Sequence, residues 1–346
     1  MVPHRFAPIT LLLLLGAVCC AAEIYVASDG DDEAAGTRNA PLATVGAAIE
    51  ASAGGDQILL RRGDRFIVSD LQLQGGRTLS AYGSGGAPVL SGALRIAAWE
   101  SLGAGRYRAA VSACEQLWSP TGRQPRARYP DSGWLRTQEG TTADRLLLEG
   151  VDDPAGSWDG ALVRWRRWSW WYETRIVDSD AGAGDLALAA RDFNAPNNVG
   201  IGSGCYLEAA GALDAEGEWW FADGAVELFS GAGAPSAGAY DAVVHDRALT
   251  LSGGAVVEGV TIREYVGSGG VLRITGAATV RDCLIERISY NGITGVWNAF
   301  GSTISGNRFA DIHGNAISWN ENFQSAGGTV IADNQFDRIG VVPGLG

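Results

Sequence analysis

Four ten-residue segments near the C-terminal end of the chain align with one another, and this repeat restricts the fold more than any other feature. The segments cover residues 256–265, 279–288, 303–312 and 330–339. Each has apolar residues at its second, seventh and tenth places, and the seventh places follow one another at steps of 23, 24 and 27 residues. A repeat of this length indicates a solenoid, in which each coil stacks on its neighbour.

The pattern inside the repeat distinguishes a helical solenoid from a β-solenoid. A helical repeat would place apolar residues about every 3.6 positions and would contain few glycines. This stretch instead alternates, and Gly and Asn punctuate its joins. Asn307 and Asn334 occupy the same place in two segments, so their side chains should stack along the solenoid. The pattern favours a β-solenoid, and a β-sandwich with coincidental spacing is the alternative.

The first part of the chain, residues 23–92, carries short motifs in a fixed order. They are Tyr25-Val26, Gly36-Thr37, Ala40-Pro41, Gly55-Asp56, Ala81-Tyr82-Gly83 and Ser91-Gly92. Thr44 is placed to cap a helix that runs to about Ala53 and covers the end of the first coil. The series resembles the start of secreted proteins of the pectate-lyase-like superfamily. This resemblance implies an all-β, right-handed parallel β-helix with an N-terminal capping helix, and it says little about the reaction.

The middle of the chain, residues 93–247, lacks the repeat and contains ten of the twelve tryptophans. Its segments 126–130 (Arg-Ala-Arg-Tyr-Pro) and 216–223 (Glu-Gly-Glu-Trp-Trp-Phe-Ala-Asp) resemble an inserted β-rich module of some β-helix glycoside hydrolases. We therefore expect a β-rich insert with Trp219 and Trp220 on a hairpin. The β-helix should then resume over residues 248–346.

The chain begins with a short polar stretch, an apolar run with five consecutive leucines, and small residues up to Ala22. This pattern predicts a secretory signal peptide over residues 1–22, and hence a secreted or periplasmic protein. A lipoprotein anchored through Cys19 or Cys20 is the second interpretation. No other segment is apolar enough to cross a membrane. The sequence ends at residue 346, shortly after the fourth aligned segment, so the coil that this segment begins is unfinished. This suggests a fragment of a longer product.

The charge of the chain restricts its partners. All 26 basic residues are arginines, because Lys is absent, and the formal net charge is −13. Such a chain is a poor nucleic-acid binder, and it would repel a polyanionic glycan without a local basic patch or a bound cation. No cofactor is indicated with certainty. A Ca²⁺ ion could be held by a cluster of acidic residues, although a solvated acidic turn fits them better: Asp29, Asp31, Asp32 and Glu33.

Candidate site residues gather at a polar turn and in the tryptophan-rich segment. The candidate catalytic residues are Asp311, His313, Glu321 and Glu286. The candidate substrate-binding residues are Trp319, Tyr290, Asn315, Arg164, Arg166 and Trp168. Extended backbone would aim alternate residues of the turn to one side, and aromatic faces with arginines suit sugar rings and carboxylates. A solvated turn and a tryptophan core are the structural alternatives.

The function indicated by this pattern is that of a secreted carbohydrate-active protein acting on a poly- or oligosaccharide. A glycoside hydrolase, which needs two carboxylates, is preferred on the resemblance of the insert. A polysaccharide lyase is the first alternative, and a non-catalytic glycan-binding or surface-structural β-helix is the second. Two acids converging on one groove would favour the hydrolase.

Overall fold

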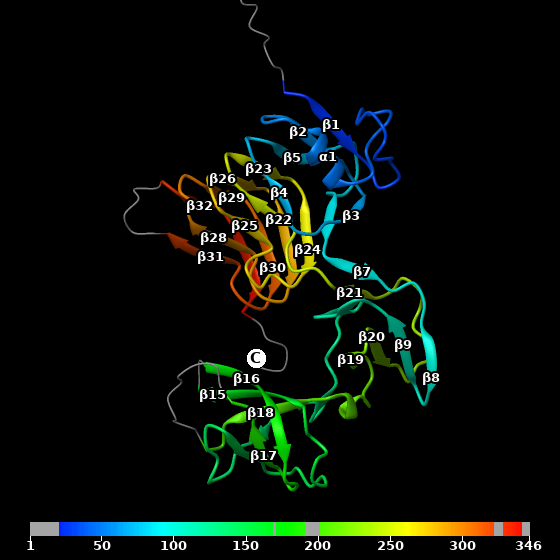
Figure 1. Cartoon of the computed structure of the whole chain (residues 1–346), viewed down its shortest axis with the longest axis vertical. Helices are drawn as coiled ribbons and strands as arrows, with labels where there is room; N and C mark the ends of the chain where they lie inside the picture. Colours follow the sequence, from blue (N-terminus) through cyan, green and yellow to red (C-terminus); the bar gives the residue numbers. More distant parts are fainter. Residues whose placement is uncertain (1–20, 169–170, 191–200, 322–327, 341–346) are drawn as a thin grey trace, which may run out of the picture.

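The computed structural model describes residues 21–168, 171–190, 201–321 and 328–340, and it consists of a parallel solenoid joined to an antiparallel insert (Figure 1). The first solenoid sheet contains β1 (Glu23–Val26), β2 (Gln57–Arg61), β5 (Thr78–Tyr82), β23 (Ala255–Glu258), β26 (Ala278–Arg281), β29 (Thr303–Ser305) and β32 (Val330–Ala332). The second contains β3 (Arg65–Ile67), β6 (Val89–Ser91), β24 (Thr261–Tyr265), β27 (Leu284–Ile288), β30 (Arg308–Ile312) and β33 (Gln335–Ile339). The third contains β4 (Leu71–Leu73), β22 (Leu249–Leu251), β25 (Leu272–Ile274), β28 (Ile293–Trp297) and β31 (Ile317–Glu321). The predicted parallel β-helix is confirmed.

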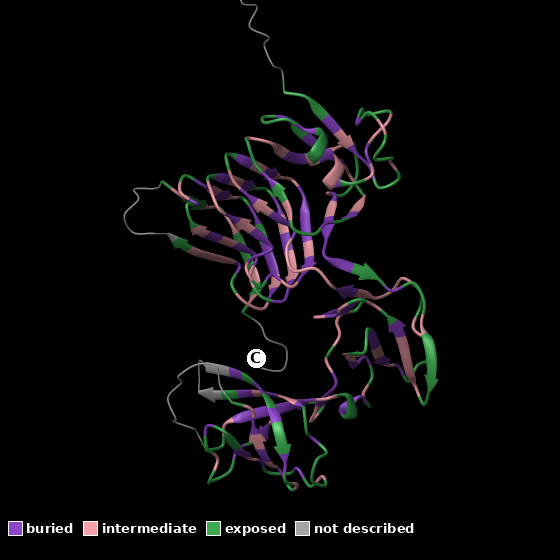
Figure 2. Cartoon of the chain, viewed as in Figure 1, coloured by how far each residue is buried: buried purple, intermediate pink, exposed green. Residues whose placement is uncertain are grey.

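The register of the solenoid stacks the aligned repeat places on one another. Ile262 pairs with Ile285, which pairs with Phe309, and Phe309 pairs with Phe336. The first three side chains are fully buried in one continuous core, and buried residues, coloured purple, recur along the solenoid strands in Figure 2. The asparagine stack is also confirmed, because Asn307 Nδ2 donates to Asn334 Oδ1 at 3.0 Å.

The ninth place of each repeat bends the second sheet. Its four residues have left-handed backbone, with φ between 51° and 64°: Glu264, Arg287, Asp311 and Arg338. Such φ values are uncommon for residues other than Gly, and here they turn the apolar tenth residue back toward the core. Their charges alternate in sign along the stack, and Arg287 contacts Glu264 while Arg338 contacts Asp311. The contacts between these opposite charges hold the four side chains in place where the backbone is left-handed.

The single α-helix of the described chain, α1 (Val45–Ala51), lies in the N-terminal region between β1 and β2 of the sequence. Thr44 caps it, since its Oγ1 accepts a hydrogen bond from Ala47 N at 3.1 Å. Val45 and Ala48 face the solenoid core. The predicted capping helix is thus confirmed, and no helix of the described residues is long and apolar enough to span a membrane.

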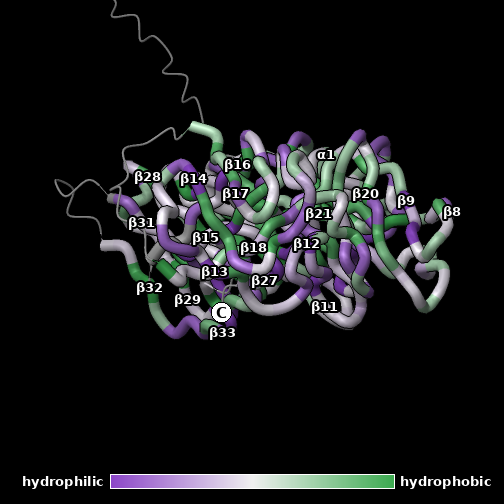
Figure 3. The backbone as a smooth tube through the Cα atoms, turned by 90° about the horizontal axis from the view of Figure 1, so that it is seen from below, coloured by the Kyte–Doolittle hydropathy of each residue, from purple (hydrophilic) through white to green (hydrophobic). Residues whose placement is uncertain are grey.

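The insert leaves the solenoid after β6 and returns at β22, and it forms three antiparallel sheets. The two sheets nearer the solenoid contain β7 (Ala93–Arg95), β8 (Glu100–Gly103), β9 (Arg106–Ala110), β10 (Leu117–Ser119), β11 (Gly122–Arg123), β19 (Trp219–Ala222), β20 (Ala225–Phe229) and β21 (Asp241–Val243). The outer sheet contains β12 (Arg128–Tyr129), β13 (Leu135–Arg136), β14 (Arg145–Leu147), β15 (Leu162–Trp168), β16 (Trp171–Asp180), β17 (Asp185–Leu188) and β18 (Gly204–Glu208). Figure 3 colours the chain by hydropathy and shows hydrophobic and hydrophilic stretches interspersed along it. Trp219 and Trp220 lie on the β19–β20 hairpin, as the sequence predicts.

The core of the insert is separate from that of the solenoid. Trp165 is fully buried between the outer sheet and its loops, and Trp219 is buried in the smaller core beside the solenoid. The three cysteines of the described chain are all buried and free, and burial raises the pKa of each thiol: Cys114, Cys205 and Cys283. The fold therefore relies on packing rather than on disulfides.

Candidate functional site

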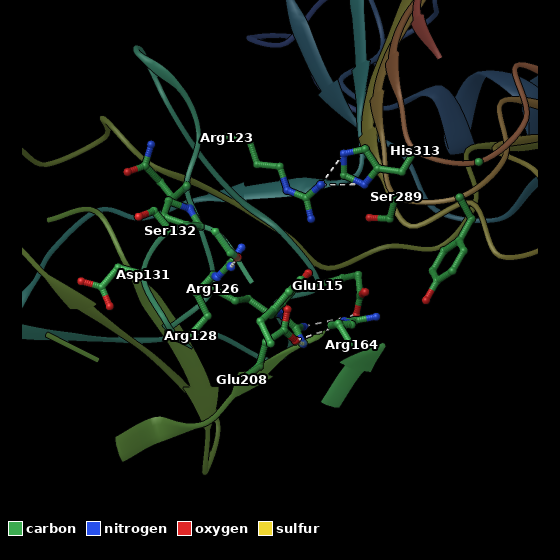
Figure 4. A pocket seen from close by; sticks show the side chains of 16 residues that line it. Glu115, Arg123, Arg126, Arg128, Asp131, Ser132, Arg164, Glu208, Ser289 and His313 are labelled. Carbon is green, nitrogen blue, oxygen red and sulfur yellow. Dashed lines mark hydrogen bonds and ion pairs between the residues drawn. The ribbon is translucent and has the colours of Figure 1, made fainter. Parts of the chain in front are cut away.

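A cleft of about 510 Å³ lies where the outer part of the insert faces the second solenoid sheet (Figure 4). The insert contributes most of its walls, and the solenoid contributes the turns that follow β27 and β30. Its charged and aromatic lining residues are Glu115, Arg123, Arg126, Arg128, Asp131, Arg164, Tyr206, Glu208, Tyr290 and His313. Four arginines and three carboxylates thus face one cavity in a chain that is acidic overall.

The floor of the cleft follows from alternation along β18. Cys205 and Leu207 point into the core of the insert, so Tyr206 and Glu208 point to the opposite face and into the cleft. Tyr206 is paired with Arg164 on β15, and Glu208 is paired with Arg128 on β12. Cross-strand neighbours on one face contact each other, so the sheet brings together side chains that are distant in sequence.

Glu208 is the most enclosed carboxylate of the cleft. Its side chain is 7% exposed, and its Oε2 lies 3.2 Å from Arg164 Nε and 3.8 Å from Arg126 Nη1. The other terminal nitrogen of Arg126 lies 3.6 Å from Glu115 Oε2, and the side chain of Glu115 is 37% exposed. The two glutamates therefore converge on one guanidinium group from different sides.

Arg128 and Tyr206 form a rigid wall beside these acids. The guanidinium carbon of Arg128 lies 3.9 Å from the centre of the Tyr206 ring. The same guanidinium donates to the carbonyl oxygens of Pro130 and Gly133 at 2.8 and 2.6 Å, which holds the loop that carries Asp131. Burial raises the pKa of Tyr206 to about 12, so its hydroxyl remains protonated at neutral pH.

His313 closes the solenoid side of the cleft. Its Nδ1 lies 2.6 Å from Arg123 Nη1 and 3.2 Å from Gln116 Nε2, so the imidazole contacts the insert directly. Burial first, and the charge of Arg123 second, lower the pKa of His313 to about 3. Burial likewise lowers the pKa of Arg123 to about 10. At neutral pH, a neutral imidazole therefore faces a charged guanidinium.

A second cleft of about 330 Å³ adjoins the first, and Arg123 and His313 line both. The remaining lining residues come from the β10–β11 turn and from the charged ladder of the solenoid: Trp118, Pro120, Thr121, Gly122, Arg287, Asp311 and Arg338. Arg287 stacks over Trp118 with its guanidinium carbon 4.8 Å from the ring centre. Asp311 accepts two hydrogen bonds from Arg338 at 2.6 and 2.9 Å, which lower the pKa of this carboxyl group.

Several of the predicted site residues meet at these clefts. His313, Tyr290 and Arg164 line the first cleft, and Asp311 lines the second together with His313. Arg166 is exposed and lines neither of the two. The predicted roles of these residues remain predictions.

Other predicted site residues lie elsewhere. Glu286 lines neither cleft, and its Oε1 lies 3.8 Å from Arg263 Nη1 on the outer face of the second sheet. Trp319 packs against the solenoid core, because Gly295 on the neighbouring strand leaves room for its ring, and it lines neither cleft; its role in substrate binding stays a prediction. The side chains of Glu321 and Trp168 lie outside the described residues.

The polar turn aims only part of its alternating side chains to one side, since Asp311 and His313 both line the second cleft and Asn315 does not. Asp311 has φ of 52°, which rotates its carboxylate toward Arg338. Asn315 is exposed and joins a second asparagine stack, where its Nδ2 donates to Asn291 Oδ1 at 3.2 Å. The left-handed backbone at the ninth repeat place thus sets the direction of the Asp311 carboxylate.

Two carboxylates of the acidic cluster near the N-terminus have partners within the protein. Asp29 pairs with Arg61 at 2.8 Å, and Asp32 accepts hydrogen bonds from Ala43 N and Thr44 N at 2.9 and 2.8 Å. Both carboxylates thus connect their turn to other segments of the N-terminal region. No group of three or more His, Cys, Asp or Glu side chains in the described part of the chain is arranged to hold a metal ion.

Sequence reasoning missed the residues that make up most of the first cleft. Tyr206 and Glu208 alternate with Cys205 and Leu207, and this pattern could have flagged a strand with one polar face. Arg126 and Arg128 belong to segment 126–130, whose pattern indicates the insert but not a cleft. Their proximity to Glu208 depends on strand pairing across about 80 residues, which no local pattern reveals.

Comparisons with known proteins agree with this architecture. No family model matches the chain. A pectate lyase of Emericella nidulans is 43% identical over 61 residues, which are 18% of this chain and only 15% of that protein. A solved structure described as a glycoside hydrolase has a TM-score of 0.70 at 17% identity, over 92% of this chain and 73% of the other. The structure of XylC with xylose has a TM-score of 0.51 at 12% identity, over 92% and 54% of the two chains.

The similarity of these structures extends beyond the solenoid. An alignment that covers 92% of the chain must include most of the insert as well as the parallel coils. At this level of identity, the likeness concerns the fold and not the reaction. The chain therefore has the parallel β-helix fold of pectate-lyase-like proteins, interrupted by a β-rich insert of the kind its sequence resembles.

Proposed function

We propose that this chain is a secreted carbohydrate-active protein that binds an oligo- or polysaccharide in the cleft between insert and solenoid, and that it hydrolyses a glycosidic bond there. The observation that carries the proposal is the convergence of Glu115 and Glu208 on Arg126 in that cleft. Glycoside hydrolysis uses two carboxyl groups that flank the scissile bond. The relatives named above, a pectate lyase and a glycoside hydrolase, support a carbohydrate substrate.

The environments of the two glutamates suggest different roles. Glu208 is enclosed and contacts two guanidinium groups, so it is held in a fixed position opposite a developing positive sugar ring. Glu115 is more exposed and has one long ion pair, so it is the carboxyl group placed at the open side of the cleft to act as the general acid. Tyr290, which is 47% exposed at the rim, offers a ring face to a sugar.

The test is replacement of each glutamate by glutamine, followed by measurement of reducing ends on a panel of glycans. Loss of a catalytic carboxylate typically lowers the rate by about 10²–10⁴-fold, and E115Q and E208Q should both fall in this range. Glu258→Gln is the matched control, because Glu258 lies on β23 and pairs with Arg281 away from both clefts. If E115Q and E208Q retain full activity and thermal stability, the assignment is wrong.

A lyase is the second candidate, and the contact between Arg123 and His313 favours it. A lyase removes the proton beside a uronate carboxylate and expels the glycosidic oxygen, which leaves a carbon–carbon double bond. A neutral imidazole can accept that proton, and a guanidinium can neutralise the carboxylate. Unsaturated uronate products, detected by ultraviolet absorbance and lost in His313→Gln, would replace the hydrolase proposal by this one.

A further inference from the structure

The two clefts are separated by a single side-chain contact. Arg123 and His313 are the residues that line both, and they touch each other across the junction. The insert contributes Arg123 from β11, and the solenoid contributes His313 from the turn after β30. The contact between Arg123 and His313 therefore lies at the junction of a cavity of about 510 Å³ and one of about 330 Å³.

The two clefts together are positively charged, in contrast to the chain as a whole. They contain six arginines: Arg123, Arg126, Arg128, Arg164, Arg287 and Arg338. They contain four carboxylates: Glu115, Asp131, Glu208 and Asp311. The difference, 6 − 4, gives a local charge of +2 within a chain of net charge −13. Such a patch raises the local concentration of anions.

Arg123 differs from the other two arginines of the second cleft. Arg287 contacts Glu264, and Arg338 contacts Asp311. For Arg123, the described part of the chain provides no carboxylate within ion-pairing distance, and its guanidinium contacts the imidazole of His313. Hydrogen bonds between a guanidinium and a carboxylate are stronger than those with a neutral group. An incoming carboxylate would therefore compete well for Arg123.

We propose that the two clefts form one extended groove for an acidic glycan, in which Arg123 binds a sugar carboxylate at the junction and gives up its contact with His313. The second cleft is then an additional subsite that only a longer chain reaches. This inference rests on the proposed binding of a glycan in the first cleft, and it adds the substrate class and the direction in which the glycan runs.

Binding measured by calorimetry tests both parts on the full chain. The probes are di- and hexamers of galacturonate, hexameric mannuronate, and the fully methyl-esterified galacturonate hexamer, which has the same length without charge. Arg123→Gln should weaken binding of the acidic hexamers about tenfold, as expected for one lost charge-assisted contact, and leave the ester unaffected. Thr121→Trp, which narrows only the second cleft, should weaken the hexamers and not the dimer.

Arg145→Gln is the matched control, because Arg145 is an exposed arginine of β14 that pairs with Asp185 and lines neither cleft. Equal affinity for ester and acid, unchanged in R123Q, overturns the acidic-glycan inference but leaves the proposed glycan binding intact. Equal affinity of T121W and the parent chain for the hexamers overturns the second subsite. If none of these probes binds while neutral glycans are cleaved, the inference fails alone; if no glycan of any kind binds, the proposed function fails with it.

Discussion

The solenoid and the insert are both built of β-strands, but their side chains are placed by different rules. In the solenoid, each residue stacks on the residue one coil away, so a position in the repeat determines a position in space, as for Ile262, Ile285 and Phe309. In the insert, antiparallel pairing joins segments without similarity, as for Arg128 and Glu208. The repetitive region thus supplies a scaffold, and the irregular region supplies most of the cleft.

This difference predicts where substitutions act. A change inside a solenoid ladder should affect stability, because every coil supports its neighbours. A change on the cleft face of the insert should affect binding, because those side chains are held by a sheet whose core lies on its other face. The predictions below test this division and the connection between the two regions.

The largest effect is expected inside the solenoid ladder. Ile285 is fully buried between Ile262 and Phe309. Ile285→Ala should lower the free energy of unfolding by about 2–5 kcal/mol through lost burial and a cavity. Urea denaturation followed by far-ultraviolet circular dichroism measures this loss. Val163→Ala, in the core of the insert, removes fewer atoms and should cost less; an equal or larger loss there would contradict the division.

The sequence predicts the solenoid well because stacking makes its pattern periodic. The apolar places of the repeat, the Asn307–Asn334 stack and the cap at Thr44 are all consequences of local pattern. The direction of Asp311 could not be predicted in the same way, since it depends on a left-handed backbone that an ordinary alternation rule ignores. The packing of Trp319 against the solenoid core could not be predicted either, since the room for its ring comes from Gly295, one coil away.

The first cleft could be predicted only in part. His313, Tyr290 and Arg164 have sequence signals, namely a polar turn and a basic strand. Glu115 and Glu208 have no such signal, because their meeting at Arg126 requires the folding of the whole insert against β12 and β18. For a site assembled between a repetitive and an irregular region, the sequence therefore indicates only some of the residues.

A smaller effect is expected at the connection between the two regions. Arg65 on the solenoid donates to Asp241 of the insert at 2.7 Å and lies 3.1 Å from the buried Glu264. Arg65→Ala should cost about 2 kcal/mol, because it removes hydrogen bonds to charged groups that are shielded from water. Since most tryptophans are in the insert, fluorescence should then report an earlier transition than circular dichroism.

The control is Arg281→Ala, which removes an exposed pair with Glu258 and should lower the free energy of unfolding by less than about 1 kcal/mol. Coincident transitions in R65A would show that the regions are joined by other contacts.

The smallest effect concerns pH, and it arises at the contact between the two regions. The folded chain holds the pKa of His313 at about 3, below its ordinary value of 6.5, because of burial and Arg123, against the opposing influence of Asp311. Above pH 6.5 the imidazole is neutral in both the folded and the unfolded chain. As the pH falls from 6.5 toward 3, the unfolded chain binds a proton that the folded chain excludes, so the folded state loses stability.

For the half-buried His313, this loss should amount to about 1 kcal/mol between pH 7 and pH 4.5, after allowance for solvent screening. His313→Gln cannot titrate, so its free energy of unfolding should fall by that much less over the same interval. Urea denaturation of both proteins at the two pH values measures the difference. His245, whose pKa is also lowered by burial, is present in both chains and cancels from the comparison. If the two proteins lose stability equally, His313 is not held in its neutral form by its contact with the insert.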